Sequence, residues 1–194
     1  MANEFYALLG RMRYINRWGL MRNSFSENIQ EHSHQVAVLA HGLALIRRDI
    51  LQLSAPDPDR CAVAALYHDA TEILTGDMPT PIKYHNASIK EAYKQLEGIA
   101  AEQLLQMLPQ QLRACYSDLL TEADDQVATI VKAADKLSAY IKCVEEQKAG
   151  NTEFESAAAQ TMASMQAMAL PELDWFLQNC LPAFFQNLDQ LGLN

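Results

Sequence analysis

Apolar residues recur along most of the chain at the three- and four-residue spacing of amphipathic helices. The clearest stripe lies in the proline-free segment 29–48 and consists of Val36, Leu39, Leu43 and Ile46. The same spacing predicts further helices at 5–18, 61–73, 87–107, 110–121, 124–148, 153–168 and 172–191. Strand-like alternation of apolar and polar residues is absent. The pattern therefore predicts an all-α protein.

Proline, glycine and capping residues indicate where these helices begin and end. Asp57 is a helix-start signal ahead of the third predicted helix. A glycine and two prolines within 75–84 predict a partly rigid loop. No Gly/Ser linker, charge block or repeat divides the sequence. We therefore expect residues 1–194 to form one domain, a single compact helical bundle.

Composition supports a packed domain and places it in a reducing compartment. The chain has 194 residues, of which 49% are hydrophobic and 20% charged. A chain of this length buries about 70% of its unfolded surface, so it needs no disulfide or structural metal in order to fold. No signal peptide or membrane span is visible. The four cysteines lack the paired spacing of a zinc ribbon or redox motif, and we expect a cytoplasmic protein with reduced Cys61, Cys115, Cys143 and Cys180.

The charge balance argues against a nucleic-acid polymer as partner but not against a single nucleotide. The formal net charge is -9, from 15 basic and 24 acidic residues. Binding to DNA or RNA depends on clustered Lys and Arg, so an acidic balance weighs against a nucleic-acid polymer. A single nucleotide is not excluded, because one or two cations or a metal suffice for one phosphate.

Two segments carry candidate chemistry on apolar helix faces. His32 extends the apolar stripe of 29–48, where it is either a core residue that donates to a carbonyl or a metal ligand facing the bundle. Taken alone, the core interpretation is favoured. His68 and Asp69 follow an apolar stretch in which polar groups need partners, and Glu72 comes one helical turn later. That spacing suits two metal ligands and a carboxylate beside a bound water.

A third segment completes a possible ligand set. Asp135 borders the apolar stripe of 124–148, and alone it is most simply a solvated Asp paired with a nearby Lys. Together, His32, His68, Asp69 and Asp135 supply two imidazoles and two carboxylates. Such mixed ligands suit one divalent metal, Mn, Co, Fe, Zn or Mg, with positions open for water and substrate.

Short motifs around these residues resemble those of a known protein family. The order His32, then His68-Asp69, then Asp135 resembles the H…HD…D signature of the HD-domain metal-dependent phosphohydrolases. Over nearly the whole chain the sequence is similar to the bacterial 5′-deoxynucleotidase family of that superfamily. The matching segments are Ile15-Asn16-Arg17-Trp18, Leu20-Met21-Arg22-Asn23, Tyr67-His68-Asp69-Ala70, Leu74-Thr75-Gly76-Asp77 and Pro79-Thr80-Pro81. Gly19 departs from the pattern, which has proline after the Arg-Trp pair.

The resemblance implies a fold, an activity and an assembly. It implies a helical bundle of the HD-domain type. It also implies hydrolysis of small-molecule 2′-deoxyribonucleoside 5′-monophosphates to deoxynucleoside and phosphate, with selection against ribonucleotides. A homodimer is implied as well, with weak support from the apolar segments Trp175-Phe176-Leu177 and Phe184-Phe185. No base-specific pocket is recognisable, so broad acceptance of purines and pyrimidines is expected.

Within that activity each matching residue has an expected role. One transition metal such as Co or Mn would be held by the four ligands named above. Arg17 would orient the phosphate, because its planar fork holds two phosphate oxygens, and Trp18 would contact the sugar. Glu72 would orient or deprotonate water, with Asp77 as the second proton-transfer candidate. Substrate contacts are expected from Arg17, Trp18, His32, Asp69, Asp77, Met78, Pro79, Thr80 and Asp135.

Two other functions stay open at this point. Other HD phosphohydrolases act on nucleoside triphosphates, cyclic nucleotides or guanosine tetraphosphate, although no triphosphate-binding cluster is evident here. A different class is a non-catalytic helical module with a structural metal site. The presence of both Glu72 and Asp77 counts against that second alternative.

Overall fold

The computed structural model describes residues 3–83, 85–121 and 124–192, and within them it is built from helices. The structure also contains short 3-10 segments at Gly10–Tyr14, Thr152–Phe154, Leu181–Phe185 and Leu188–Gln190 and a π-helical turn at Ile46–Ile50. The described residues form no strand, so the all-α prediction is confirmed. The α-helices are α1 (Phe5–Leu9), α2 (Ile29–Leu45), α3 (Pro58–Tyr67), α4 (Glu72–Thr75), α5 (Thr80–Lys83), α6 (Ala87–Gln106), α7 (Gln110–Thr121), α8 (Asp125–Lys148), α9 (Glu155–Gln166) and α10 (Pro171–Asn179).

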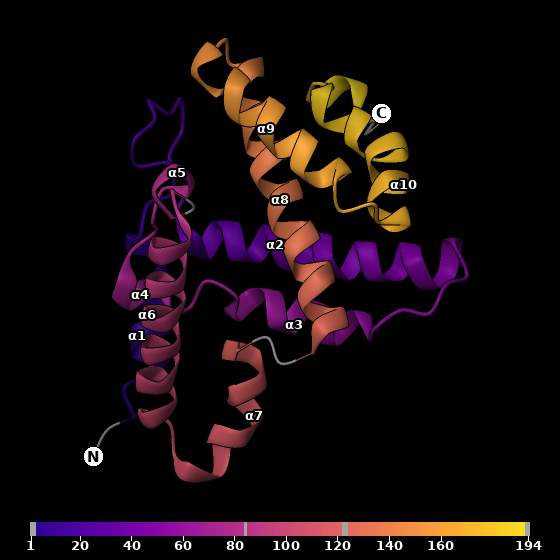
Figure 1. The fold of residues 1–194 in the computed structure, drawn as a ribbon. Coiled ribbons are helices and arrows are strands. Elements are labelled where there is room, and N and C mark those ends of the chain that lie inside the picture. The colour runs from indigo at the N-terminus through magenta and orange to yellow at the C-terminus, as the bar shows by residue number, and fades with distance from the viewer. Residues whose placement is uncertain (1–2, 84, 122–123, 193–194) are drawn as a thin grey trace.

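Helices α2, α3 and α8 form the centre of the fold. Figure 1 shows α8 crossing α2 and α3, with α9 and α10 packed on one side and α6 and α7 on the other. Val36 and Leu43 of α2 meet Leu137 and Ile141 of α8 in the main core cluster, and all four are fully buried. Each such burial stabilises the fold by about 1.5–3 kcal/mol. The crossing of α2 and α8 is therefore fixed by packing.

Capping residues set where the central helices begin. Asn28 and Glu31 form a capping box at the start of α2, in which each side chain accepts the other residue's backbone N–H. Asp124 accepts two backbone N–H groups at the start of α8, and Asp57 caps α3 as the sequence predicts. These caps determine the register of the helices that carry the candidate ligands.

Three predicted helices are wrong in their extent. The helix predicted at 5–18 ends at Tyr14, after which the chain is extended and Asn16 pairs with Asn28 in an isolated antiparallel bridge. The helix predicted at 61–73 is interrupted at 68–71, where backbone N–H groups bond carbonyls three residues back. The helix predicted at 172–191 breaks after Asn179, because Pro182 cannot donate to a continuing α-helix.

The loop predicted at 75–84 contains a short helix. Gly76 has a φ of 74°, in the region that favours glycine, and ends α4. α5 then begins at Thr80, with Pro81 in its first turn, where a missing N–H costs nothing. Tyr84 lies outside the described residues.

Three further expectations concern the cysteines, membrane-spanning helices and the C-terminal aromatic residues. All four cysteines are free thiols. Within the described ranges, we find no helix whose length and apolar character would let it cross a bilayer. Of the C-terminal aromatic residues, Phe176 is buried and Trp175 and Phe184 pack against the core, whereas Phe185 is exposed. Most of the aromatic side chains that suggested a dimer interface therefore pack within the protein's own core.

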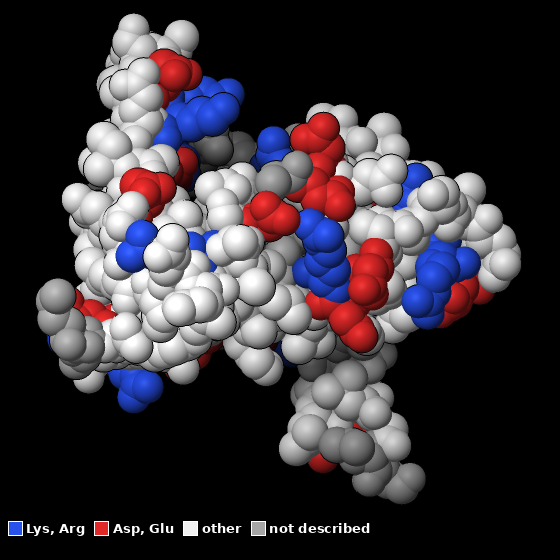
Figure 2. Space-filling view, turned by 90° about the horizontal axis from the view of Figure 1, so that it is seen from below, with Lys and Arg blue, Asp and Glu red and all other residues white. Residues whose placement is uncertain are grey.

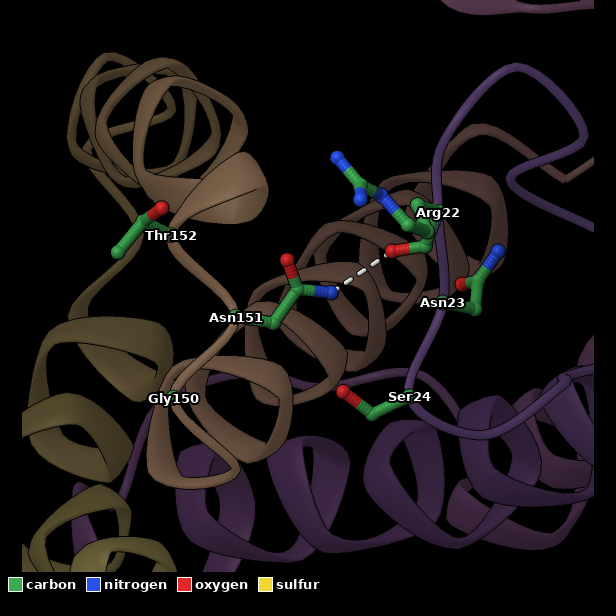
Figure 3. Close-up of a pocket in the computed structure, with 6 residues that line it drawn as sticks. All are labelled: Arg22, Asn23, Ser24, Gly150, Asn151 and Thr152. Carbon is green, nitrogen blue, oxygen red and sulfur yellow. Dashed lines mark hydrogen bonds between the residues drawn. The ribbon is translucent and has the colours of Figure 1, made fainter.

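A buried ion pair joins α8 to the non-helical residues 15–28, here called segment 15–28. Lys142 and Glu146 are one turn apart on α8, and their side chains are almost completely buried. Lys142 donates to the carbonyl of Phe25, and Glu146 accepts the backbone N–H of Ser24. Across the shallow pocket of Figure 3, the Asn151 side chain also donates to the carbonyl of Arg22. These contacts fix segment 15–28 against α8.

Glu146→Ala tests this attachment. Removing one partner leaves the Lys142 ammonium buried without its anion, so the free energy of unfolding should fall by about 3–5 kcal/mol. Glu153→Ala is the matched control, because Glu153 contacts Arg22 of the same segment at the surface, and it should cost less than about 1 kcal/mol. Urea denaturation followed by circular dichroism measures both. Similar losses in the two variants would contradict the buried attachment.

Candidate metal centre

Three segments bring the four candidate ligands together. His32 comes from the start of α2, His68 and Asp69 from the turn between α3 and α4, and Asp135 from the middle of α8. His32 Nε2 lies 3.1 Å from Asp135 Oδ1 and 3.6 Å from Asp69 Oδ2. His68 Nε2 lies 3.2 Å from Asp69 Oδ2. His32 is fully buried whereas the Asp135 side chain is 39% exposed, so the cluster opens to solvent beside Asp135.

Hydrogen bonds on the opposite ring nitrogens determine which nitrogen of each histidine is available. His68 Nδ1 lies 2.7 Å from the carbonyl oxygen of Ala65, so Nδ1 must carry a proton. Ser138 Oγ donates to Gln35 Oε1 and therefore accepts from His32 Nδ1, 3.1 Å away. In both neutral rings the Nε2 lone pair thus points at the carboxylates. Outer hydrogen bonds of this kind orient metal-binding histidines.

This arrangement needs a positive charge at its centre. His68 Nε2 is buried and makes no hydrogen bond, although Asp69 Oδ2 lies 3.2 Å away, because the Nε2 of a neutral imidazole and the oxygen of an ionised carboxylate both offer lone pairs. One nitrogen or oxygen from each of His32, His68 and Asp135 lies within 4.8 Å of the others. A divalent cation accepts such lone pairs from imidazole and carboxylate together. The residues therefore fit a metal.

The directions in which the pKa values of the cluster shift also indicate a need for positive charge at its centre. Burial raises the pKa of Asp69, but His68, His32 and Arg17 outweigh it and hold that pKa well below its usual range. Burial lowers the pKa of His32. Burial also lowers the pKa of His68, but Asp69 outweighs it and raises the value to about 9. In metal-free protein a proton on His68 Nε2 thus supplies the missing positive charge.

Two further carboxyl groups lie beside the cluster. Glu72, the first residue of α4, is 7% exposed, and its Oε2 is buried with no hydrogen bond in the described structure. Burial, then the charges of Asp69 and Asp77, raise the pKa of Glu72 to about 9. Burial also raises the pKa of Asp77, in the coil after α4. Carboxyl groups with raised pKa values can accept and release protons near neutral pH.

Arg17 and Trp18 approach from segment 15–28. Arg17 Nη1 lies 3.4 Å from Asp69 Oδ2, and Arg17 Nε lies 3.2 Å from Glu27 Oε2. Trp18 Nε1 donates to the same Glu27 oxygen at 2.9 Å, and its ring packs against Phe154. A guanidinium therefore stands beside the ligand cluster, with an aromatic ring next to it in sequence.

The remaining predicted contacts are less closely tied to the cluster. Met78 and Pro79 are half-buried in the coil after Asp77, and no contact found among the described residues joins them to the ligands. The side chain of Thr80 lies outside what the structure describes. Gly19 sits in a turn closed by the bond from Met21 N–H to the Trp18 carbonyl, and a Cβ at Gly19 would meet nothing within 4 Å.

Sequence reasoning missed three supporting residues. Ser138 follows Asp135 by three residues and Gln35 follows His32 by three, so each shares a helix face with a candidate ligand. That spacing is a signal that could have found them. Glu27 lies in segment 15–28, where no periodicity links it to Arg17 or Trp18.

Comparison with known proteins identifies the relationship. A family model described as 5′-deoxynucleotidase YfbR-like matches residues 4–184. The chain belongs to this family. A 5′-deoxynucleotidase of Erwinia tasmaniensis is 46% identical over 192 residues, covering 98% of this chain and 96% of that relative. The 5′-deoxynucleotidase YfbR of Shigella flexneri is 44% identical over 192 residues, with the same coverage. The resemblance carried by the motifs is confirmed.

Solved structures of lower identity share the fold. An HD-domain phosphohydrolase of Listeria innocua matches with a TM-score of 0.80 at 19% identity, covering 95% of this chain and 90% of that one. The HD phosphohydrolase of cyanophage S-2L, bound to dA and one catalytic Zn²⁺ ion, matches with a TM-score of 0.67 at 20% identity, covering 91% and 95%. The 5′-deoxynucleotidase YfbR-like chain therefore has the HD-domain fold that its motifs predict.

Ser138→Ala tests the orientation of His32. Without the hydroxyl, the Nδ1 proton loses its acceptor and the ring its orientation, so metal affinity should fall by about 10–100-fold. Thr129→Ala is the matched control, because Thr129 is a hydroxyl residue on the exposed face of the same helix. Competition titration with a chelator of known affinity measures both variants. Wild-type affinity in Ser138→Ala would exclude a positioning role for Ser138.

Proposed function

We propose that the protein is a metal-dependent 5′-deoxynucleotidase, a phosphomonoester hydrolase that converts 2′-deoxyribonucleoside 5′-monophosphates to deoxynucleoside and phosphate. One observation carries the proposal beyond family membership: Arg17 stands 3.4 Å from Asp69 at the edge of an imidazole–carboxylate cluster. A cluster of imidazoles and carboxylates alone is common to metal sites of many different functions. A buried guanidinium beside it supplies the second cation that a phosphate dianion requires.

We assign the metal to His32, His68, Asp69 and Asp135. A divalent metal held there supplies Lewis acidity toward a phosphoryl oxygen and lowers the pKa of water. Arg17 binds the other phosphate oxygens and aligns phosphorus for in-line attack. Phosphate esters react slowly in water, so this positioning and charge neutralisation must provide most of the rate enhancement.

Proton transfer falls to the two carboxyl groups beside the cluster. Glu72 is assigned to accept the proton of the attacking water, because its Oε2 is buried without a hydrogen bond in the described structure. Burial and the charges of Asp69 and Asp77 favour the protonated form of Glu72 in metal-free protein, and the positive charge of a bound metal would favour the ionised form that acts as a base. Asp77 donates to the leaving 5′-oxygen, and its pKa is likewise raised by burial. Met78, Pro79 and Thr80 follow Asp77 and would complete the nucleotide contacts.

Sugar selectivity is assigned to Trp18. Its neighbour Arg17 holds the phosphate, and the sugar is covalently attached to that phosphate. The indole is therefore placed near the sugar and can exclude a 2′-hydroxyl by its bulk. Contact with one added hydroxyl discriminates by roughly 10²-fold, and a steric clash by more. Base identity has no evident recognition element, so purine and pyrimidine nucleotides are both substrates.

The proposal includes an assembly and a compartment. We propose one domain per chain and a homodimer, which light scattering at micromolar concentration tests directly. Four free thiols suit a reducing cytoplasm. On the face shown in Figure 2, Lys and Arg side chains are scattered among acidic ones, which supports a small-molecule substrate over a nucleic-acid polymer.

A substrate panel tests the function as a whole. Metal-loaded protein is mixed separately with deoxyribonucleoside and ribonucleoside monophosphates, cyclic nucleotides and nucleoside triphosphates. Phosphate release is followed together with the nucleoside and nucleotide products, because hydrolysis of a cyclic nucleotide releases no phosphate. Rapid release from dAMP and dTMP alone supports the proposal. Equal kcat/KM for dAMP and AMP would refute the deoxy selectivity. Hydrolysis only of triphosphates or cyclic nucleotides, or of nothing, would assign the protein to one of the other two classes.

Metal removal should abolish the activity. We expect dialysis against a chelator to eliminate phosphate release, and Mn or Co to restore it better than Mg, which prefers oxygen ligands. Asp69→Ala and His68→Ala should lose both bound metal and turnover, as measured by elemental analysis and steady-state kinetics. Full activity in demonstrably metal-free protein would refute the site.

Glu72→Gln separates proton transfer from metal binding. Loss of the base should lower kcat by about 10²–10⁴-fold, while the metal content and nucleotide affinity stay at wild-type values. Glu91→Gln, at an exposed carboxylate of α6, is the matched control and should leave kcat unchanged. Near-normal turnover in Glu72→Gln would transfer the role of base to Asp77. Loss of the metal would instead make Glu72 a ligand.

A further inference from the structure

We infer that Glu27 is a positioning residue that sets sugar selectivity by holding Arg17 and Trp18 through one carboxylate oxygen. This inference rests on the proposed function. Glu27 does not contact the candidate metal ligands. Arg17 and Trp18 lie between it and the place assigned to the substrate. Its role is to join phosphate binding and sugar recognition in one rigid unit.

The contacts of Glu27 are concentrated on a single atom. Glu27 is 8% exposed, and its Oε2 accepts the Trp18 indole N–H at 2.9 Å. The same oxygen lies 3.2 Å from Arg17 Nε. The backbone adds a third link, because Arg17 N–H donates to the Glu27 carbonyl at 2.9 Å. One buried residue therefore fixes the main chain and both functional side chains of the Arg17-Trp18 pair.

The backbone of Trp18 needs such support. Its φ is 59°, in the left-handed region that bulky residues rarely adopt. The turn is held by bonds from Met21 N–H and the Asn23 side chain to the Trp18 carbonyl. Those bonds fix the main chain but leave the indole free to turn about its side-chain torsions. Phe154 contacts the ring, with centroids 5.3 Å apart, and Glu27 orients its polar edge.

The geometry also limits how Arg17 can bind phosphate. A guanidinium has five N–H donors in a planar fork, and here Nη1 donates to Asp69 Oδ2 at 3.4 Å. Nε lies 3.2 Å from Glu27 Oε2 in an ion pair, without a hydrogen bond among the described residues. Anchoring at two points fixes the plane of the fork before substrate arrives. Because phosphate and sugar are covalently joined, a fixed fork delivers the sugar to a fixed place beside the indole. Preorganisation of this kind makes discrimination by shape effective.

Glu27→Ala and Glu27→Gln separate this role from simple support of the fold. Alanine removes the acceptor for Trp18 and the anion for Arg17. Glutamine keeps a carbonyl oxygen for the indole and removes only the charge. Glu31→Gln is the matched control, since Glu31 is an exposed carboxylate four residues away and glutamine keeps its capping bond. All variants are made with Trp175→Phe, which leaves Trp18 as the sole indole.

Two readouts are recorded for each variant. The first is the ¹H–¹⁵N resonance of the Trp18 indole and its exchange with solvent in metal-free protein, which needs no substrate. The second is the ratio of kcat/KM for dAMP to that for AMP.

We expect Glu27→Ala to shift the resonance, speed its exchange and lower the ratio by about tenfold, the effect of losing a hydrogen bond to a charged group. Glu27→Gln should keep the resonance protected and the ratio near wild type while raising KM for dAMP. Glu31→Gln should match wild type in both readouts.

Opposite results would overturn the inference. A folded Glu27→Ala protein with an unchanged, protected indole resonance and an unchanged dAMP to AMP ratio excludes the positioning role. If Glu27→Ala does not fold, Glu27→Met keeps the length and bulk of the side chain while removing both carboxylate oxygens, and an unchanged indole resonance and ratio in that variant are equally decisive. Wild-type protein without deoxynucleotidase activity would refute the proposed function, and the indole resonance would then decide the link between Glu27 and Trp18 by itself.

Discussion

The carboxylate of Asp69 meets two imidazole nitrogens and a guanidinium, and the charge balance at this point governs the design of the surrounding structure. A largely buried anion is stable only with positive charge or donors around it. Arg17 supplies part of that charge, 3.4 Å away, and the neutral forms of His32 and His68 present lone pairs rather than protons. The remaining charge must come from a proton or a metal ion. The same demand explains why Ser138 and the Ala65 carbonyl hold the far sides of the two rings.

Segment 15–28 shows how an irregular stretch of backbone can be as well determined as a helix. It begins where α1 and its 3-10 extension end, and it is fixed by the bridge between Asn16 and Asn28, by Glu146 of α8 and by Glu27 within itself. Functional side chains often lie on such segments because a rigid scaffold can aim them freely. Here the scaffold is the packed crossing of α2 and α8. Polar contacts to that scaffold thus position Arg17, whereas apolar packing of the helices positions His32 and Asp135.

The all-α class, the helix starts at Asp57 and Asp124 and the family relationship could all be predicted from the sequence. Apolar periodicity and capping residues are local signals, and local signals specify helices well. The predicted helices at 5–18 and 61–73 extended too far, because apolar and polar residues continue to alternate at helical spacing where tertiary contacts bend the chain. No glycine or proline marks the turn at His68. The grouping of the four candidate ligands followed from residue types, whereas Glu27 depends on two segments pairing side by side, which periodicity does not encode.

Anomalous diffraction from crystals grown with cobalt tests the central claim most directly, because it locates the ion and identifies the atoms around it. The account predicts one dominant peak, about 2.0–2.2 Å from Nε2 of both His32 and His68 and from a carboxylate oxygen of Asp69 and of Asp135. Both Nδ1 atoms would keep their bonds to Ser138 and to the Ala65 carbonyl. A peak at another place, or binding through Nδ1 with the rings turned over, would contradict it.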